Sequence, residues 1–259
     1  MTSSPPCMPE SLPLARVSLL VTRPALPGAR LCRRLSALGV RCTHIPLLAT
    51  EAQTPPAQVL ATLASTTVDA VVFISVAAVE HGLPCLREQA PHLLAAPLIA
   101  VGASTAAALA AQSLHGEQPD NADSDGLLAM ALLQHPRHVL IVRGVGGREL
   151  LADTLRARAA QVDYLEVYRR ILPATSRADI ATLLTTAVPA LTLISSAEAL
   201  RHWQDCAGAD WTRTQLLVVS QRLADLAHSA GAQHLLVAKG ATDADIEAAL
   251  RTLVTPPTP

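Results

Sequence analysis

Short, almost wholly apolar segments recur along this chain, and segments with helical periodicity separate them. Such segments are typical of strands that are covered on both faces of a parallel sheet. Their alternation with helices predicts an α/β architecture with parallel sheets. The expected strands are 17–22, 70–74, 98–101, 139–143, 191–194, 216–219 and 235–238, and the expected helices include 29–38, 149–158, 197–206 and 244–253.

The chain also repeats itself once, with a period of about 120 residues. Four segments of the first half each resemble one of the second half, in the same order. The pairs are 17–40 with 138–162, 71–82 with 191–203, 99–109 with 217–227, and 124–132 with 242–250. Each match is weak alone, but four matches in the same order are much stronger evidence for a repeat. The repeat therefore predicts two similar parallel-sheet α/β domains.

Two segments, 40–50 and 162–172, alternate polar with apolar residues and follow equivalent parts of the two repeats. We interpret them as extended crossings between the domains, which pair into a small ribbon and form a hinge. Both ends of the chain are rich in proline, so residues 1–13 and 256–259 are expected to be flexible tails.

Composition excludes several classes of partner. A net charge of −1 and an aromatic content of 2% argue against nucleic-acid binding, which needs a basic surface or stacking rings. The uncharged stretch 89–116 is interrupted by Pro97 and Gly102, so we expect a strand and an alanine-rich helix there, not a membrane span. The first residues lack the pattern of a signal peptide, and the five cysteines show no CxxC spacing. These features favour a reducing cytoplasm.

In a doubly wound domain, ligands bind beyond the carboxyl ends of the strands. Hydroxyls, glycines and arginines gather at the predicted ends, which suits carboxylates or phosphates. Serines also cap helices commonly, and this simpler role remains open for each of them. The candidate residues at these positions are Arg23, Ser75, Thr105, Arg143, Gly144, Ser195, Ser196 and Ser220.

Three other motifs are incomplete. The glycines of 144–147 follow a strand, but Glu149 replaces the last glycine of the dinucleotide fingerprint. The segment 121–126 resembles the start of a calcium loop, but Leu132 replaces its bidentate glutamate, so we expect a turn before a helix near Gly126. His135 and His138 flank a proline, and we expect no metal site. An enzyme of this composition would act mainly by holding and orienting its substrate.

One stretch carries a more specific signal. Residues 142–151, a helix and then residues 162–170 resemble the strand–Arg-Gly–Arg-Glu–helix–Val-Tyr-Arg signature of the uroporphyrinogen-III synthase family of tetrapyrrole biosynthesis. Supporting matches follow the family's order over residues 17–253. They lie at 21–24, 73–75, 101–106, 124–128 and 194–199.

The resemblance implies two α/β domains joined by a two-stranded β-ladder linker, with the active site in the cleft. It implies that residues 14–45 belong with 173–255, while 50–165 form the second domain. The family cyclises hydroxymethylbilane with loss of water and inversion of the fourth pyrrole, using no cofactor. Its members are usually monomeric. Hydroxymethylbilane synthase, which makes the substrate, is implied as a transient partner.

The resemblance also assigns roles. Tyr168 matches a tyrosine near the cleft and is the candidate proton donor for loss of the hydroxyl, the alternative being a packing residue of the linker. Thr105 matches a threonine at a helix start. The residues that would contact substrate carboxylates are Ser75, Arg143, Arg148, Ser195 and Ser196. The chain departs from the family at Ile74, at 159–160, where Gly-Ala is usual, and at 220–223. A two-domain module that binds or senses a small anion without turnover is the alternative function.

Overall fold

The computed structural model describes residues 13–121, 124–147 and 149–253. Most of both expected tails lies outside these residues. The chain divides into two compact units: unit 1 comprises residues 1–49 and 171–259, and unit 2 comprises residues 50–170. The chain thus leaves unit 1 once, forms the whole of unit 2, and returns.

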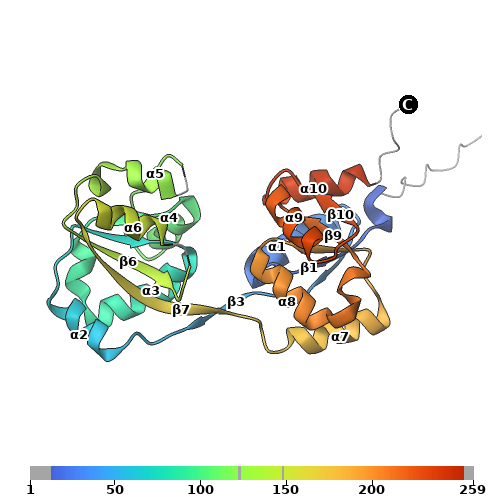
Figure 1. Cartoon of the computed structure of the whole chain (residues 1–259), viewed down its shortest axis with the longest axis horizontal. Coiled ribbons are helices and arrows are strands. Elements are labelled where there is room, and N and C mark those ends of the chain that lie inside the picture. The colour runs from blue at the N-terminus through green and yellow to red at the C-terminus, as the bar shows by residue number, and fades with distance from the viewer. Residues whose placement is uncertain (1–12, 122–123, 148, 254–259) are drawn as a thin grey trace, which may run out of the picture. The chain divides into compact units, whose positions relative to one another are not determined.

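Unit 1 contains a five-stranded sheet in the order β10-β9-β8-β1-β2, in which every neighbouring pair is parallel. Apolar side chains of α7, α8 and α9 cover one face, and those of α1 and α10 cover the other. Figure 1 shows these helices around the sheet. The strands are β1 (Ser18–Val21), β2 (Arg41–His44), β8 (Leu191–Ile194), β9 (Gln215–Val218) and β10 (Leu235–Val237); the helices are α1 (Ala25–Ala37), α7 (Ser176–Thr186), α8 (Ala197–Ala207), α9 (Gln221–Ser229) and α10 (Asp243–Thr252).

Unit 2 contains a second five-stranded sheet, in the order β3-β7-β6-β4-β5, with β7, β6, β4 and β5 parallel. Helices α2, α3 and α4 pack on one face, and α5 and α6 pack on the other. The strands are β3 (Ala49–Ala52), β4 (Ala70–Phe73), β5 (Leu98–Ala100), β6 (His138–Gly144) and β7 (Gln161–Ile171); the helices are α2 (Ala57–Ser65), α3 (Val76–Gln89), α4 (Ala103–Ala110), α5 (Ser124–Ala129) and α6 (Leu150–Ala157). Short 3₁₀ segments lie at Pro13–Arg16, Pro91–Ala95, Ala131–Leu133 and Gly208–Thr212.

The two sheets confirm the predicted fold class and explain the repeat. The strand order β2-β1-β8-β9 in unit 1 matches the order β7-β6-β4-β5 in unit 2. β2, β1, β8 and β9 therefore correspond in turn to β7, β6, β4 and β5. The chain order differs, because β1 and β2 precede unit 2, whereas their counterparts β6 and β7 end it. The two repeats therefore form sheets with the same arrangement of strands, but the chain enters the two sheets at different strands.

The expectation that 40–50 and 162–172 lie outside the sheets and pair with each other is wrong in part. β2 pairs with β1 inside unit 1, and β7 pairs with β6 from Gln161 to Tyr168. Only β3, at the end of the first segment, neighbours β7. β2 and β3 are edge strands with partly exposed side chains, and β7 lies next to an edge, so all three show more polar residues than central strands do.

Ala159 stands where the family pattern usually has glycine. This residue follows α6 with φ at +65°, in the left-handed region that favours glycine. Gly39 occupies the equivalent place after α1, with φ at +92°. The chain therefore places a strained alanine where its own other unit has glycine.

The alanine-rich stretch folds as expected, into β5 and α4. In the described part of the chain, no helix has both the length and the apolar character needed to cross a membrane.

Candidate functional site

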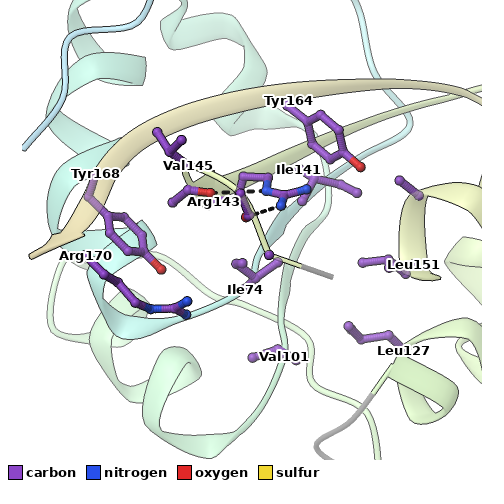
Figure 2. Close-up of a pocket in the computed structure, with 14 residues that line it drawn as sticks. Ile74, Val101, Leu127, Ile141, Arg143, Val145, Leu151, Tyr164, Tyr168 and Arg170 are labelled. Atoms are coloured by element: carbon purple, nitrogen blue, oxygen red, sulfur yellow. Dashed lines mark hydrogen bonds between the residues drawn. The ribbon is translucent and has the colours of Figure 1, made fainter. Parts of the chain in front are cut away.

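A cavity of about 430 Å³ lies at the carboxyl ends of the unit 2 strands (Figure 2). Its wall is apolar on one side, and its polar groups come from β6, β7 and the glycine-rich turn that follows β6. The apolar wall consists of Ile74, Val101, Leu127, Ile141, Leu151 and Ala152; the remaining lining residues are Arg143, Gly144, Val145, Gly146, Gly147, Tyr164, Tyr168 and Arg170.

Tyr168 projects from β7 and is only 2% exposed. Its hydroxyl lies 3.0 Å from the Oγ of Ser75, which in turn accepts a hydrogen bond of 3.0 Å from the backbone N–H of Ala78. A Cβ at Gly144 would lie 2.5 Å from the Tyr168 ring, so only glycine lets the ring adopt this position. The candidate proton donor is thus held by β6, β7 and the start of α3.

Arg143 is the penultimate residue of β6, and its side chain is 4% exposed. Its guanidinium donates to the carbonyl oxygens of Gly144, at 3.2 Å, and of Gly146, and to Oε1 of Glu149 at 2.9 Å. Oε1 of Glu166 lies 3.8 Å from the Arg143 Nε. These contacts fix the turn in which Gly146 and Gly147 adopt positive φ values of +70° and +110°.

Glu149 joins Arg143 to Tyr164. The Tyr164 hydroxyl donates to Oε2 of Glu149, and the Arg143 guanidinium lies 4.5 Å from the centroid of the Tyr164 ring. The hydrogen bonds from Tyr164 and Arg143 lower the pKa of Glu149 below its ordinary value. Burial raises the pKa of Tyr164, and the hydrogen bond to Glu149 raises it further, so the hydroxyl stays a donor.

Ser75, Ser196 and Ser220 confirm the capping interpretation. Their hydroxyls accept hydrogen bonds from backbone N–H groups in the first turns of α3, α8 and α9, at 3.0, 3.0 and 3.3 Å. Capping leaves the hydroxyl proton available for a further contact. Ser195 lies between β8 and the Ser196 cap, and Thr105 is buried in the first turn of α4. Substrate contact by these residues stays a prediction.

Arg23 is buried and already paired inside unit 1. Its Nη1 lies 2.8 Å from Oδ1 of Asp243, and its Nη2 donates to the carbonyl of Ala241. Exposed Arg30 binds the other Asp243 oxygen at 3.0 Å. These partners give Arg23 a structural role, and its contact with substrate stays a prediction. Arg148, also a candidate, lies outside the described residues.

Two residues that line the cavity, Tyr164 and Arg170, were missed in the sequence, and so was Glu149, which binds the lining residues Arg143 and Tyr164. Tyr164, Tyr168 and Arg170 all lie on β7, but the β6–β7 register shifts beside Gly144, and the two tyrosines pack against different apolar clusters, so a simple strand alternation would not have joined them. Arg170 is exposed and, among the described residues, has neither a hydrogen bond nor an ion pair. It therefore brings an available positive charge to the cavity.

The described residues contain no cluster of three or more side chains suited to a metal ion. His138, one of the two histidines considered, binds Oδ2 of Asp163 at 2.8 Å. Part of the calcium-like segment, including Asp123, lies outside the description, and Gly126 lies within α5 and not before it. The expected helix near Gly126 is present as α5, which begins at Ser124, and the turn expected before it lies partly outside the described residues.

The fold and cavity define a two-unit parallel α/β protein with polar groups gathered where such folds bind ligands. A family model described as uroporphyrinogen-III synthase HemD matches residues 29–247, and the chain belongs to this family. The uroporphyrinogen-III synthase of Escherichia coli (strain K12) is 34% identical over 92% of this chain and 100% of its own length, and that of Salmonella typhimurium is 36% identical over the same shares.

Solved structures show the same fold at low sequence identity. A mutant uroporphyrinogen III synthase of the extremely thermophilic bacterium Thermus thermophilus aligns with a TM-score of 0.61 and 18% identity, over 92% of this chain and 98% of that one. The uroporphyrinogen-III synthetase of Helicobacter pylori 26695 aligns with the same TM-score and 14% identity, over 91% and 99%.

Proposed function

We propose that this protein is a uroporphyrinogen-III synthase, which converts hydroxymethylbilane into uroporphyrinogen III and water with inversion of the fourth pyrrole. The observation that carries the proposal is the family match from residue 29 to residue 247, supported by two relatives of the same name that align over their whole length.

The chemistry of this substrate fits the cavity. Loss of the substrate hydroxyl needs a proton, and the Tyr168 O–H is the donor that we assign to this step. Ser75 accepts from Ala78, which leaves its own proton free to hydrogen-bond the Tyr168 oxygen as negative charge develops there. Ring closure later releases a proton from a pyrrole carbon, which restores the phenol. Water is then the only net product besides the macrocycle.

The enzyme must also hold the reactive intermediate in the conformation that inverts the last ring, since free in solution it closes without inversion. The substrate carries eight carboxylates. We assign their contacts to Thr105, Arg143, Gly144, Arg148 and Arg170 in unit 2, and to Ser195, Ser196 and Ser220 in unit 1. Charge-assisted hydrogen bonds of this kind orient a polyanion without a large net positive charge.

We further propose that the protein acts in the cytoplasm as a monomer without a cofactor, and that it receives its unstable substrate from hydroxymethylbilane synthase. The test is incubation with freshly generated hydroxymethylbilane, followed by separation of the uroporphyrinogen isomers. Isomer III is expected. Isomer I alone, at the rate of the protein-free control, would contradict the proposal and favour the anion-binding module.

A further inference from the structure

We propose that Arg143 and Tyr164 form a subsite for one carboxylate group, which Glu149 occupies when no ligand is bound. The identity of the natural ligand, a carboxylate arm of the tetrapyrrole, rests on the proposed function. The subsite itself rests on the geometry of unit 2.

The two donors already hold a carboxylate. Arg143 Nη1 lies 2.9 Å from Oε1 of Glu149, and the Tyr164 hydroxyl donates to Oε2. Each carboxylate oxygen thus receives its own hydrogen bond, one from Arg143 of β6 and the other from Tyr164 of β7. Any carboxylate that entered the cavity could make the same pair of bonds.

Burial separates the permanent part of this cluster from the replaceable part. The Arg143 side chain is 4% exposed, whereas that of Glu149 is 48% exposed. Arg143 is fixed further by the carbonyls of the glycine-rich turn and lies against the Tyr164 ring. Glu149 can therefore rotate into water when another carboxylate takes its place, but Arg143 cannot.

The charges of the cluster are balanced while Glu149 occupies the subsite. Glu166 lies 3.8 Å from Arg143, and Arg156 lies 5.4 Å from the centroid of the Tyr164 ring, so the cluster contains two arginines and two glutamates. An incoming carboxylate that displaces Glu149 restores the hydrogen bonds of both donors. Glu149 therefore competes with the ligand, and its removal should strengthen carboxylate binding.

The test is an NMR titration of the full chain with sodium glutarate at constant ionic strength, followed at the Gly144 and Gly146 amides. Because half-exposed ion pairs are weak, we expect Glu149→Gln to bind glutarate about two- to fivefold more tightly than the wild type. Adding Tyr164→Phe to this variant should weaken its binding of glutarate about threefold. Glu149→Ala replaces Glu149→Gln if the latter does not fold.

Glu51→Gln is the matched control. Glu51 is 45% exposed and pairs with Arg169 of β7, whereas Glu149 pairs with Arg143 and Tyr164. This variant removes the same charge and should bind glutarate as the wild type does. Equal affinities in the Glu149→Gln and Glu51→Gln variants would overturn the subsite. That result with isomer III still formed refutes the subsite alone, whereas tighter glutarate binding without turnover refutes the proposed function alone.

Discussion

The phenolic oxygen of Tyr168 lies 3.0 Å from the Oγ of Ser75, although 93 positions separate the two residues in the chain. β7 supplies the tyrosine, and the turn between β4 and α3 supplies the serine. Because Ser75 also caps α3, the position of the candidate acid depends directly on the start of a helix.

Replacement of Tyr168 by phenylalanine tests the acid. The Tyr168→Phe variant keeps the ring that packs against Gly144 and loses only the hydroxyl. We expect turnover of hydroxymethylbilane to fall by about 10²-fold, a typical contribution of a general acid, while the melting temperature changes little. Turnover equal to that of the wild type would make Tyr168 a packing residue.

Ser75 and Ser196 cap equivalent helices with hydrogen bonds of the same length. Loss of either cap should cost about 1 kcal/mol of unfolding free energy. The Ser75→Ala variant also deprives the buried Tyr168 hydroxyl of its partner, so we expect it to lose about 1 kcal/mol more than Ser196→Ala. Equal losses in urea unfolding would show that the Tyr168 contact contributes no stability.

Arg23 and Arg30 bind the same carboxylate from different environments, with side chains that are 8% and 68% exposed. The Arg23→Ala variant leaves Asp243 and the Ala241 carbonyl without their buried donor, and should lose about 2 kcal/mol of stability. The exposed pair is weaker, so Arg30→Ala should lose at most about 1 kcal/mol. Thermal unfolding of the two variants measures the difference, and the reverse order would be inconsistent with a buried anchor.

Ala159 and Gly39 make a reciprocal pair. Both residues adopt positive φ after equivalent helices. Since a left-handed alanine costs about 1 kcal/mol relative to glycine, Ala159→Gly should raise the melting temperature and Gly39→Ala should lower it. A fall in melting temperature for Ala159→Gly would mean that the greater freedom of glycine in the unfolded chain outweighs the strain.

The central strands were predictable because both of their faces are buried. Residues 191–194 were identified with their observed bounds, and their side chains are all buried. The same rule failed for β2 and β7, whose exposed positions interrupt the apolar pattern. A rule based on uniform hydrophobicity therefore finds the middle of a sheet and misses its edges.

The site was only partly visible in the sequence for a similar reason. Ser75, Arg143 and Gly144 could be placed at strand ends, and Tyr168 was identified by its match to the family's tyrosine. The structure brings these residues together in unit 2. The partners of Arg143 could not, because Glu149 reaches it across a turn and Tyr164 comes from the neighbouring strand. Neither contact corresponds to a fixed spacing within one helix or strand.

The interrupted course of unit 1 has a consequence for synthesis on the ribosome. β1 needs β8 as its neighbour, but residues 191–194 follow β1 by the whole length of unit 2. At about 5–20 residues per second, roughly 10–30 s pass between the appearance of these strands. Unit 2 can fold in that interval, while the apolar β1 segment waits without its partner. Early release of the nascent chain would therefore expose β1 and favour aggregation.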